Sequence, residues 1–202
     1  MLASQTPRIQ RNKKAQREPA IGLSTLTFFT RLGWIGVSGR NSGVVGMSIG
    51  HTRQTAAQRA IDRKSCESGP PPMDPEFDPF EVTEWLEVLA ARIDAYAQGE
   101  PDDFRDVLVE HQALTRFQRK VLSACRAIPY GQTASYAELA ARCGSPGAAR
   151  AVGNIMARNR VPLIIPCHRV LNSSGELGGF SAPGGVTTKR KLLDLERHVD
   201  AD

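Results

Sequence analysis

Residues 23–50 form a long, largely apolar stretch, "LSTLTFFTRLGWIGVSGRNSGVVGMSIG", that is rich in Thr, Val, Ile and Phe. β-Branched and aromatic residues of this kind are enriched in strands, whereas Gly and Asn-Ser-Gly are typical of turns. The pattern therefore predicts a strand–turn–strand unit with its hairpin turn near residues 40–43.

A helical pattern follows a proline-rich segment. Residues 68–80, "SGPPPMDPEFDPF", predict a loop or linker because their prolines interrupt regular structure. Apolar residues then recur at helical spacing from residue 82 to about residue 96, and they are Val82, Trp85, Leu86, Leu89 and Ile93. The acidic segment "QGEPDDFRD" ends this first, mixed α/β unit.

The next segment, "TRFQRKVLSACRAI", predicts a helix that opens a second unit. Thr115 and Gln118 have the spacing of a capping box, in which each side chain bonds the backbone N–H of the other residue. One face of this helix is lined by Phe117, Val121, Cys125 and Ile128. We therefore interpret Cys125 as a core residue without a chemical role.

Two short helices are predicted after the turn "PYGQ". Ser135 and Glu138 form a second capping box for "YAELAARC", which Gly144 ends. Ser145 and Pro146 then suggest an N-cap and a first-turn proline for the helix "PGAARAVGNIMARN". The pair predicts a helix-turn-helix, and Cys143 in the first helix is expected to serve packing.

The second of these helices has little side-chain bulk. Ala148, Ala149, Ala151 and Gly153 leave much of its surface bare, while Arg150 and Arg158 project from it. Such a helix can pack closely against another helix. Alternatively, it is slim enough to approach a narrow groove such as the DNA minor groove, which is about 6 Å wide.

The net charge of +5 combines two opposed blocks. Residues 61–112 contain 14 acidic and 4 basic residues, whereas residues 113–193 contain 12 basic and 2 acidic residues. The basic block is the electrostatic footprint expected of a polyanion-binding protein. A solvated basic face without a partner is the alternative.

The composition argues against metal-binding, disulfide-rich and membrane-spanning proteins. The four cysteines form no CxxC pair and the four histidines are scattered, so we expect no metal and no disulfide framework. We expect a reducing compartment, which is the cytoplasm or, alternatively, the nucleoid or nucleus. No run approaches the roughly 18 apolar residues of a membrane span, so no membrane partner is expected. Residues 1–20 are basic but lack the apolar core of a signal peptide, and we interpret them as a disordered arm or an over-extended start.

The segment "IIPCHRVLNSSG" carries the candidate chemistry. Cys167 ends an apolar run and precedes His168, so it is either a small core residue or a displayed nucleophile. A thiol near its ordinary pKa of about 8.5 is only a few per cent thiolate at neutral pH and needs a proton acceptor. Adjacent residues of an extended chain point to opposite faces, so a bend or a bridging water is required to bring His168 to the thiol.

"PCHRV" preceded by "AARAVGNIMARNRVPLIIP" makes the sequence resemble the O6-alkylguanine-DNA alkyltransferases, also called methylated-DNA–protein-cysteine methyltransferases. The resemblance covers about residues 113–196 and includes "FQRKVL", "IPYGQTASYAELA" and "LLDLE". It implies a ribonuclease-H-like α/β domain over residues 21–110. A mainly α DNA-binding domain with a winged-helix-type helix-turn-helix would follow over residues 111–202.

The implied activity is a single, irreversible transfer of an alkyl group from guanine O6 to Cys167. A soft thiolate suits attack on such a carbon. The implied partner is double-stranded DNA containing O6-alkylguanine, with O4-alkylthymine as a second candidate lesion. We expect a monomer that uses no cofactor.

The resemblance also implies roles for individual residues. Glu196 would polarise His168, which activates the thiol through water, and Asn159 would brace the loop that carries Cys167. Arg150 would fill the space left by the flipped nucleotide, while Tyr136 would push on its backbone. The DNA-facing small residues would be Ala148, Ala149 and Gly153. The guanine edge would be read by the backbone of Cys167 and Val170 together with Ser181. Phe180 stands where some members carry tyrosine, so only apolar packing is expected from it.

Three other functions compete with this one. A non-enzymatic lesion binder would keep the fold but carry tryptophan in place of the cysteine, which Cys167 argues against. A transcription regulator would need side chains that read base edges, and the slim helix has few of them. A cysteine hydrolase would have no use for the basic block or the alanine-rich helix.

Overall fold

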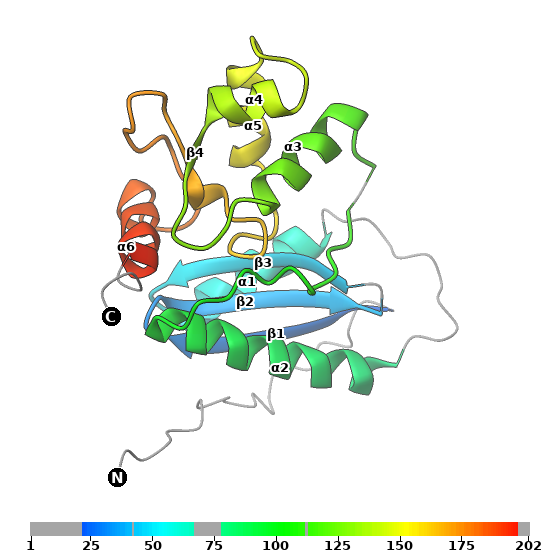
Figure 1. The fold of residues 1–202 in the computed structure, drawn as a ribbon. Coiled ribbons are helices and arrows are strands. Elements are labelled where there is room, and N and C mark those ends of the chain that lie inside the picture. The colour runs from blue at the N-terminus through cyan, green and yellow to red at the C-terminus, as the bar shows by residue number, and fades with distance from the viewer. Residues whose placement is uncertain (1–21, 42, 67–77, 112, 198–202) are drawn as a thin grey trace. The chain divides into compact units, whose positions relative to one another are not determined.

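The computed structural model describes residues 22–41, 43–66, 78–111 and 113–197 (Figure 1). The arm expected at residues 1–20 and most of the expected linker lie outside these residues. The chain divides into two compact units, one ending at Glu100 and the other beginning at Pro101. The sequence places this boundary later, between residues 110 and 111.

The first unit contains a three-stranded antiparallel sheet in the order β1-β2-β3. Its strands are β1 (Ser24–Thr30), β2 (Gly33–Arg40) and β3 (Gly43–His51). The hairpin expected near residues 40–43 joins β2 to β3. The stretch nevertheless forms three strands rather than the two predicted, because a further tight turn separates β1 from β2.

That turn lacks the usual Asn-Gly signature and is closed by a threonine side chain. Oγ1 of Thr30 accepts from the backbone N–H of Leu32 at 3.1 Å and donates to the carbonyl of Gly33, also at 3.1 Å. Gly33 has a φ of 93°, and a Cβ at this position would lie 2.7 Å from the carbonyl oxygen of His51. The turn therefore requires a glycine at this position.

Two helices pack against the sheet, and the first was not predicted. Helix α1 (Gln54–Cys66) contacts β2 and β3, and of its residues only Ala57 and Ile61 are buried. So narrow an apolar stripe gives a weak helical pattern. Helix α2 (Pro79–Gln98) runs beside β1 and β2 (Figure 1).

Helix α2 begins three residues before the predicted start. Asp78 is its N-cap and accepts a hydrogen bond from the backbone N–H of Phe80 at 2.7 Å. Pro79 therefore belongs to the first helical turn, where its missing N–H costs nothing, rather than to a loop. In the described part of the chain, no helix is long and apolar enough to cross a bilayer.

The second unit is mainly helical, with one short pair of parallel strands. Its elements are α3 (Arg116–Arg126), β4 (Ala134–Ser135), α4 (Tyr136–Arg142), α5 (Ala149–Ala157), the 3₁₀ helix η1 (Cys167–Arg169), β5 (Val170–Leu171) and α6 (Val186–Arg197). Both predicted capping boxes are present, at Thr115–Gln118 and Ser135–Glu138. Cys125 and Cys143 are buried, as their helical patterns predict.

The predicted start of α5 is wrong. The helix begins at Ala149, and its N-cap residue Ala148 makes no side-chain cap bond. Ser145 and Pro146 instead belong to a turn that the backbone N–H of Ala148 closes on the carbonyl of Ser145 at 2.9 Å. Pro146 occupies the second position of this turn, which its fixed φ favours. Helices α4 and α5 still pack against each other, as a helix-turn-helix requires.

Candidate active site

Cys167 lies where a buried apolar segment turns into a short 3₁₀ helix. Residues 161–171 are all buried, and the backbone N–H of Arg169 donates to the carbonyl of Pro166 at 2.9 Å. The helix η1 supplies the bend that an extended chain would lack. Cys167 and His168 therefore follow each other around a turn, and Cys167 retains 5% exposure.

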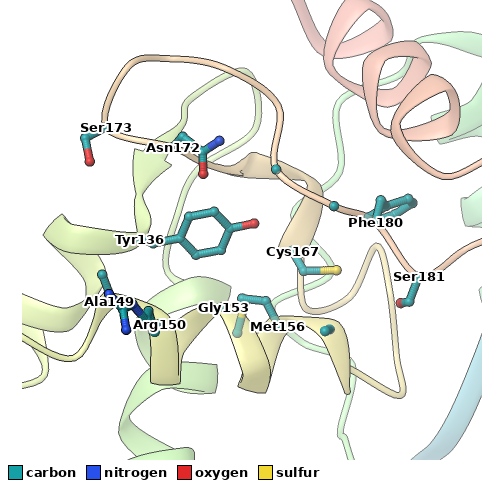
Figure 2. Close-up of a pocket in the computed structure, with 13 residues that line it drawn as sticks. Tyr136, Ala149, Arg150, Gly153, Met156, Cys167, Asn172, Ser173, Phe180 and Ser181 are labelled. Atoms are coloured by element: carbon teal, nitrogen blue, oxygen red, sulfur yellow. The ribbon is translucent and has the colours of Figure 1, made fainter.

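The pocket beside Cys167 has a volume of about 560 Å³. It is lined by Tyr136, Ala149, Arg150, Gly153, Met156, Ala157, Cys167, Asn172, Ser173, Gly178, Gly179, Phe180 and Ser181. Figure 2 shows the ring of Tyr136 extending from α4 on one side of Cys167, with Phe180 and Ser181 on the other. Seven residues singled out from the sequence thus meet around one cavity.

Several lining residues were not anticipated, and Gly178 is the clearest of them. A Cβ at this position would lie 2.7 Å from the hydroxyl of Tyr136, so any other residue here would force the Tyr136 side chain to shift. Met156, Asn172 and Ser173 also face the pocket. The sequence around a single Met or Asn does not indicate that it lines a pocket. These residues come together only because the fold brings α5 beside the loop that follows β5.

Asn159 lies beneath the cysteine loop and contacts it at three points. Its Nδ2 donates to the carbonyl of Ile165 at 2.7 Å and to Sγ of Cys167 at 3.2 Å. Its Oδ1 accepts from the backbone N–H of Val161 at 3.1 Å. The amide therefore holds the loop on both sides and directs a donor at the sulfur, where it would stabilise a thiolate.

His168, which follows Cys167, forms a fully buried pair with Glu196. His168 Nε2 lies 2.8 Å from Glu196 Oε1. Burial lowers the pKa of His168, against the opposing effect of Glu196, so the imidazole is neutral near pH 7. Because a carboxylate accepts, the contact places the imidazole proton on Nε2, leaving Nδ1 as the basic nitrogen.

The charge of Glu196 is secured by its neighbours. Burial by itself raises the pKa of this carboxyl, but its hydrogen bonds and charge interactions with His168 and Arg169 outweigh burial and hold the pKa at about 2. Arg169 contributes two close contacts, Nε to Oε2 and Nη2 to Oε1, both at 2.9 Å. Glu196 is therefore ionised throughout the physiological range.

Two buried cations that the sequence did not single out complete the site. The first is Arg169, which contacts Glu196. It lies within the "PCHRV" segment, but sequence reasoning gave it no role. Lys189 on α6 is fully buried, with Nζ 2.5 Å from the carbonyl of Val170 and 5.8 Å from the centre of the Tyr136 ring. Burial lowers the pKa of Lys189, against the opposing effect of the cysteine thiols at 167 and 125.

The small residues of α5 do not form its packing face. The buried residues of this helix are Val152 and Met156, whereas Ala149 and Gly153 line the pocket and Ala151 is exposed. Arg150 is exposed at the pocket mouth. The bare surface of α5 is therefore available to a ligand, and close packing against another helix does not account for it.

No cluster of three or more His, Cys, Asp or Glu side chains suited to a metal is present among the residues that the structure describes. What these residues do assemble is a cysteine with an amide donor, a buried histidine–carboxylate pair and a helix with a bare surface. An activatable cysteine beside a ligand-sized pocket is typical of proteins that use a nucleophilic cysteine.

Comparison with known proteins agrees with that class. Residues 116–198 match the family model described as "6-O-methylguanine DNA methyltransferase, DNA binding domain". The methylated-DNA–protein-cysteine methyltransferase of Mycobacterium leprae (strain TN) is 42% identical over 132 residues, which are 62% of this chain and 77% of that protein. The chain belongs to the methylated-DNA–protein-cysteine methyltransferase family.

Solved structures extend the similarity to both units. The O6-methylguanine methyltransferase of Mycobacterium tuberculosis aligns with a TM-score of 0.64 at 33% identity, over 89% of this chain and 96% of that one. The Mycobacterium tuberculosis OGT in complex with DNA aligns with a TM-score of 0.60 at 32% identity, over 85% and 91% of the two chains. The mixed α/β fold is thus shared with these proteins.

Proposed function

We propose that this protein repairs DNA by transferring an alkyl group from the O6 atom of guanine to Sγ of Cys167. The observation that carries this assignment is the position of that sulfur. It opens on the pocket, receives the Asn159 amide at 3.2 Å and lies one residue from the buried His168–Glu196 pair. Activity as a methylated-DNA–protein-cysteine methyltransferase follows from membership of the family.

The first chemical step is deprotonation of the thiol. Nε2 of His168 is held by Glu196, so Nδ1 is the nitrogen that takes the proton, and we propose that a bridging water carries it from Sγ. The imidazolium that results is stabilised by the ionised Glu196, and the thiolate by the Asn159 amide. Each charge that develops therefore meets an opposite charge or dipole that is already in place.

The second step is a displacement at the alkyl carbon. The sulfur–carbon bond forms as the carbon–O6 bond breaks, and the electron pair of the broken bond goes to the guanine, which then regains a proton. The product on the protein is a thioether, which has no good leaving group. Each chain therefore reacts once.

The alkylated base must leave the duplex to reach this pocket. We propose that Arg150 fills the vacated space, while the ring of Tyr136 packs against the extruded nucleotide. Ala148, Ala149 and Gly153 allow the backbone of α5 to approach the groove closely. The guanine edge would be read by the backbone of Cys167 and Val170 together with Ser181. Phe180 offers only apolar contact to the base or its alkyl group.

Several finer assignments belong to the same proposal. The three-stranded sheet with its helices corresponds to a ribonuclease-H-like domain, and α4 with α5 to a winged-helix-type helix-turn-helix. The partner is double-stranded DNA containing O6-alkylguanine, with O4-alkylthymine as a second lesion. We propose that the protein acts as a monomer and without a cofactor, in the cytoplasm or, alternatively, in the nucleoid or nucleus.

Intact mass spectrometry after incubation with O6-methylguanine duplex tests the function. The expected result is a gain of one methyl group per chain, with no second addition at excess DNA. Peptide mapping should place the methyl group on Cys167 and leave the other cysteines, Cys66, Cys125 and Cys143, unmodified. An unchanged mass would instead indicate a lesion binder or a regulator, and turnover of an ester substrate would indicate a hydrolase.

A further inference from the structure

The guanidinium of Arg169 is shared between two carboxylates. Nε and Nη2 contact Glu196, whereas Nη1 lies 2.9 Å from Oδ1 of Asp103 and donates to the carbonyl of Ile128 at 2.6 Å. We infer that Asp103 is a positioning residue for alkyl transfer, because it offsets the charge of Arg169 and leaves that of Glu196 to stabilise the imidazolium of His168. This inference rests on the proposed function.

A charge balance of the buried network explains the need for a second carboxylate. Arg169 contacts Glu196 directly, so its positive charge offsets part of the stabilisation that Glu196 gives to a protonated His168. The buried Lys189 adds a second positive charge that acts on His168. Asp103 places a negative charge on the other side of Arg169. Asp103 thus offsets one of the two positive charges that disfavour the imidazolium formed together with the thiolate.

The backbone around Asp103 holds its carboxylate in place. Phe104 is 1% exposed, and its backbone N–H donates to the side chain of Asp102 at 2.7 Å. Nη2 of Arg126 donates to the carbonyls of Phe104 at 3.0 Å and Arg105 at 3.3 Å. Because these hydrogen bonds hold the backbone at residues 104 and 105, the Asp103 carboxylate stays in contact with Arg169.

Other charged groups face the same network. Glu196 and Lys189 reach His168 from α6, while Arg169 and Cys167 belong to its own segment. The pKa of His168 is lowered first by burial, and the positive charges of Arg169 and Lys189 lower it further, while Glu196 raises it. A carboxylate on the far side of Arg169 therefore opposes one of the effects that make His168 a weaker base.

Asp103 also has a second partner. Oδ2 of Asp103 lies 3.4 Å from Nη2 of Arg105, whose side chain is 57% exposed. Solvent screens that outer pair, whereas the Arg169 guanidinium is 1% exposed. Because the Asp103 side chain is itself 27% exposed, its effect on His168 should be smaller than that of Glu196.

The test is the pH dependence of single-turnover methyl transfer by the full chain from O6-methylguanine duplex at saturating protein. In Asp103→Asn the side-chain oxygen can still accept from Arg169, so the fold is preserved while the charge is lost. We expect the plateau rate to fall about 3- to 10-fold. We also expect the acid limb to move to lower pH, because the histidine becomes a weaker base.

Two variants and one direct measurement accompany this experiment. Asp103→Glu should restore the plateau and the acid limb toward those of the unmodified chain. Asp194→Asn is a matched control, since Asp194 pairs with Arg197 at 3.7 Å on the exposed face of α6, and it should change neither. Imidazole ¹⁵N shifts of His168, recorded without DNA, should show the lowered pKa in Asp103→Asn directly.

The inference is overturned by a slower Asp103→Asn variant whose acid limb and His168 titration have not moved, because Asp103 would then only brace its segment. A variant indistinguishable from the unmodified chain overturns it equally. Absence of transfer by the unmodified chain is a different result, since it rejects the proposed function itself.

Discussion

The side-chain amide of Asn159 donates simultaneously to Sγ of Cys167, at 3.2 Å, and to the carbonyl of Ile165, at 2.7 Å. One rigid amide group thus holds the loop and directs a donor at the sulfur, and we propose that it stabilises the developing thiolate. Replacing Asn159 by an apolar side chain of similar volume removes these hydrogen bonds and keeps most of the packing, so the two contributions can be measured apart.

Asn159→Leu should slow methyl transfer by about 10- to 100-fold, since a hydrogen bond to a charged group contributes about 1.5–3 kcal/mol. It should also raise the pKa of the thiol, because the thiolate loses its donor. The pH dependence of iodoacetamide labelling at Cys167 measures that change without DNA. Asn154→Leu, an exposed position on α5, is the control. An unchanged labelling profile in Asn159→Leu would limit Asn159 to a structural role.

Cys167→Ser should abolish transfer and retain binding to alkylated duplex, because a hydroxyl is a far poorer nucleophile of similar volume. Cys66→Ser, at an exposed cysteine, should react like the unmodified chain. The measurement is intact mass together with a binding titration. Residual transfer by Cys167→Ser would identify a different cysteine as the acceptor.

Glu196→Gln should lower the free energy of unfolding at pH 7 by about 3 kcal/mol, because it leaves Arg169 buried without its main counter-charge. The pKa of this carboxyl is held near 2 in the folded chain against an ordinary value of 4.5. A depressed pKa contributes stability that is present above about pH 4.5 and is lost as the pH falls toward about 2. Urea unfolding at a series of pH values should therefore show the difference between the two proteins shrinking across this window. A difference independent of pH would contradict the assignment of that charge.

Arg150→Ala should slow transfer on duplex DNA about tenfold, because an unfilled gap leaves neighbouring bases unstacked. It should leave the reaction with free O6-alkylguanine base nearly unchanged, since no extrusion is needed there. Arg158→Ala, at the other end of α5, is the matched control for the loss of an exposed positive charge. Equal slowing of Arg150→Ala on both substrates would mean that Arg150 supports the pocket and does not fill the duplex.

Affinity for unmodified duplex should fall steeply as salt is raised from low to physiological concentration. The block at residues 113–193 carries 12 basic and 2 acidic residues, and contacts between such residues and phosphates release counterions. Fluorescence anisotropy at several salt concentrations gives the slope. Binding that is insensitive to salt would remove the electrostatic basis for DNA recognition.

The local features of this fold could be predicted from sequence because they depend on residues a few positions apart. The capping boxes at Thr115 and Ser135 each join residues three apart. By contrast, the turn that separates β1 from β2 uses a threonine side chain in place of the usual turn residues, and α1 buries only two of its side chains. Such segments could not be distinguished from loops by their sequence patterns alone.

Some residues of the candidate site could likewise be predicted from the sequence, and others could not. Cys167 and its neighbour His168 are adjacent in sequence, and the family resemblance brought in Glu196, Asn159 and Tyr136. Asp103 could not be found by either route, since its contact with Arg169 joins residues 66 positions apart. Only the fold places a carboxylate from the start of the second unit beside the "PCHRV" arginine.

The short parallel pair of β4 and β5 has a consequence for how the protein meets DNA. Backbone pairing of Ala134 with Val170 and of Ser135 with Leu171 ties the start of α4 to the chain directly after Cys167. The start of the helix that carries Tyr136 and the segment that carries the sulfur are therefore held together by backbone pairing before DNA arrives. Much of the cost of extrusion is then the cost of opening the base pair. A base pair already weakened by its alkyl group opens at lower cost, so selection of the lesion begins in the stability of the DNA, before the pocket is reached.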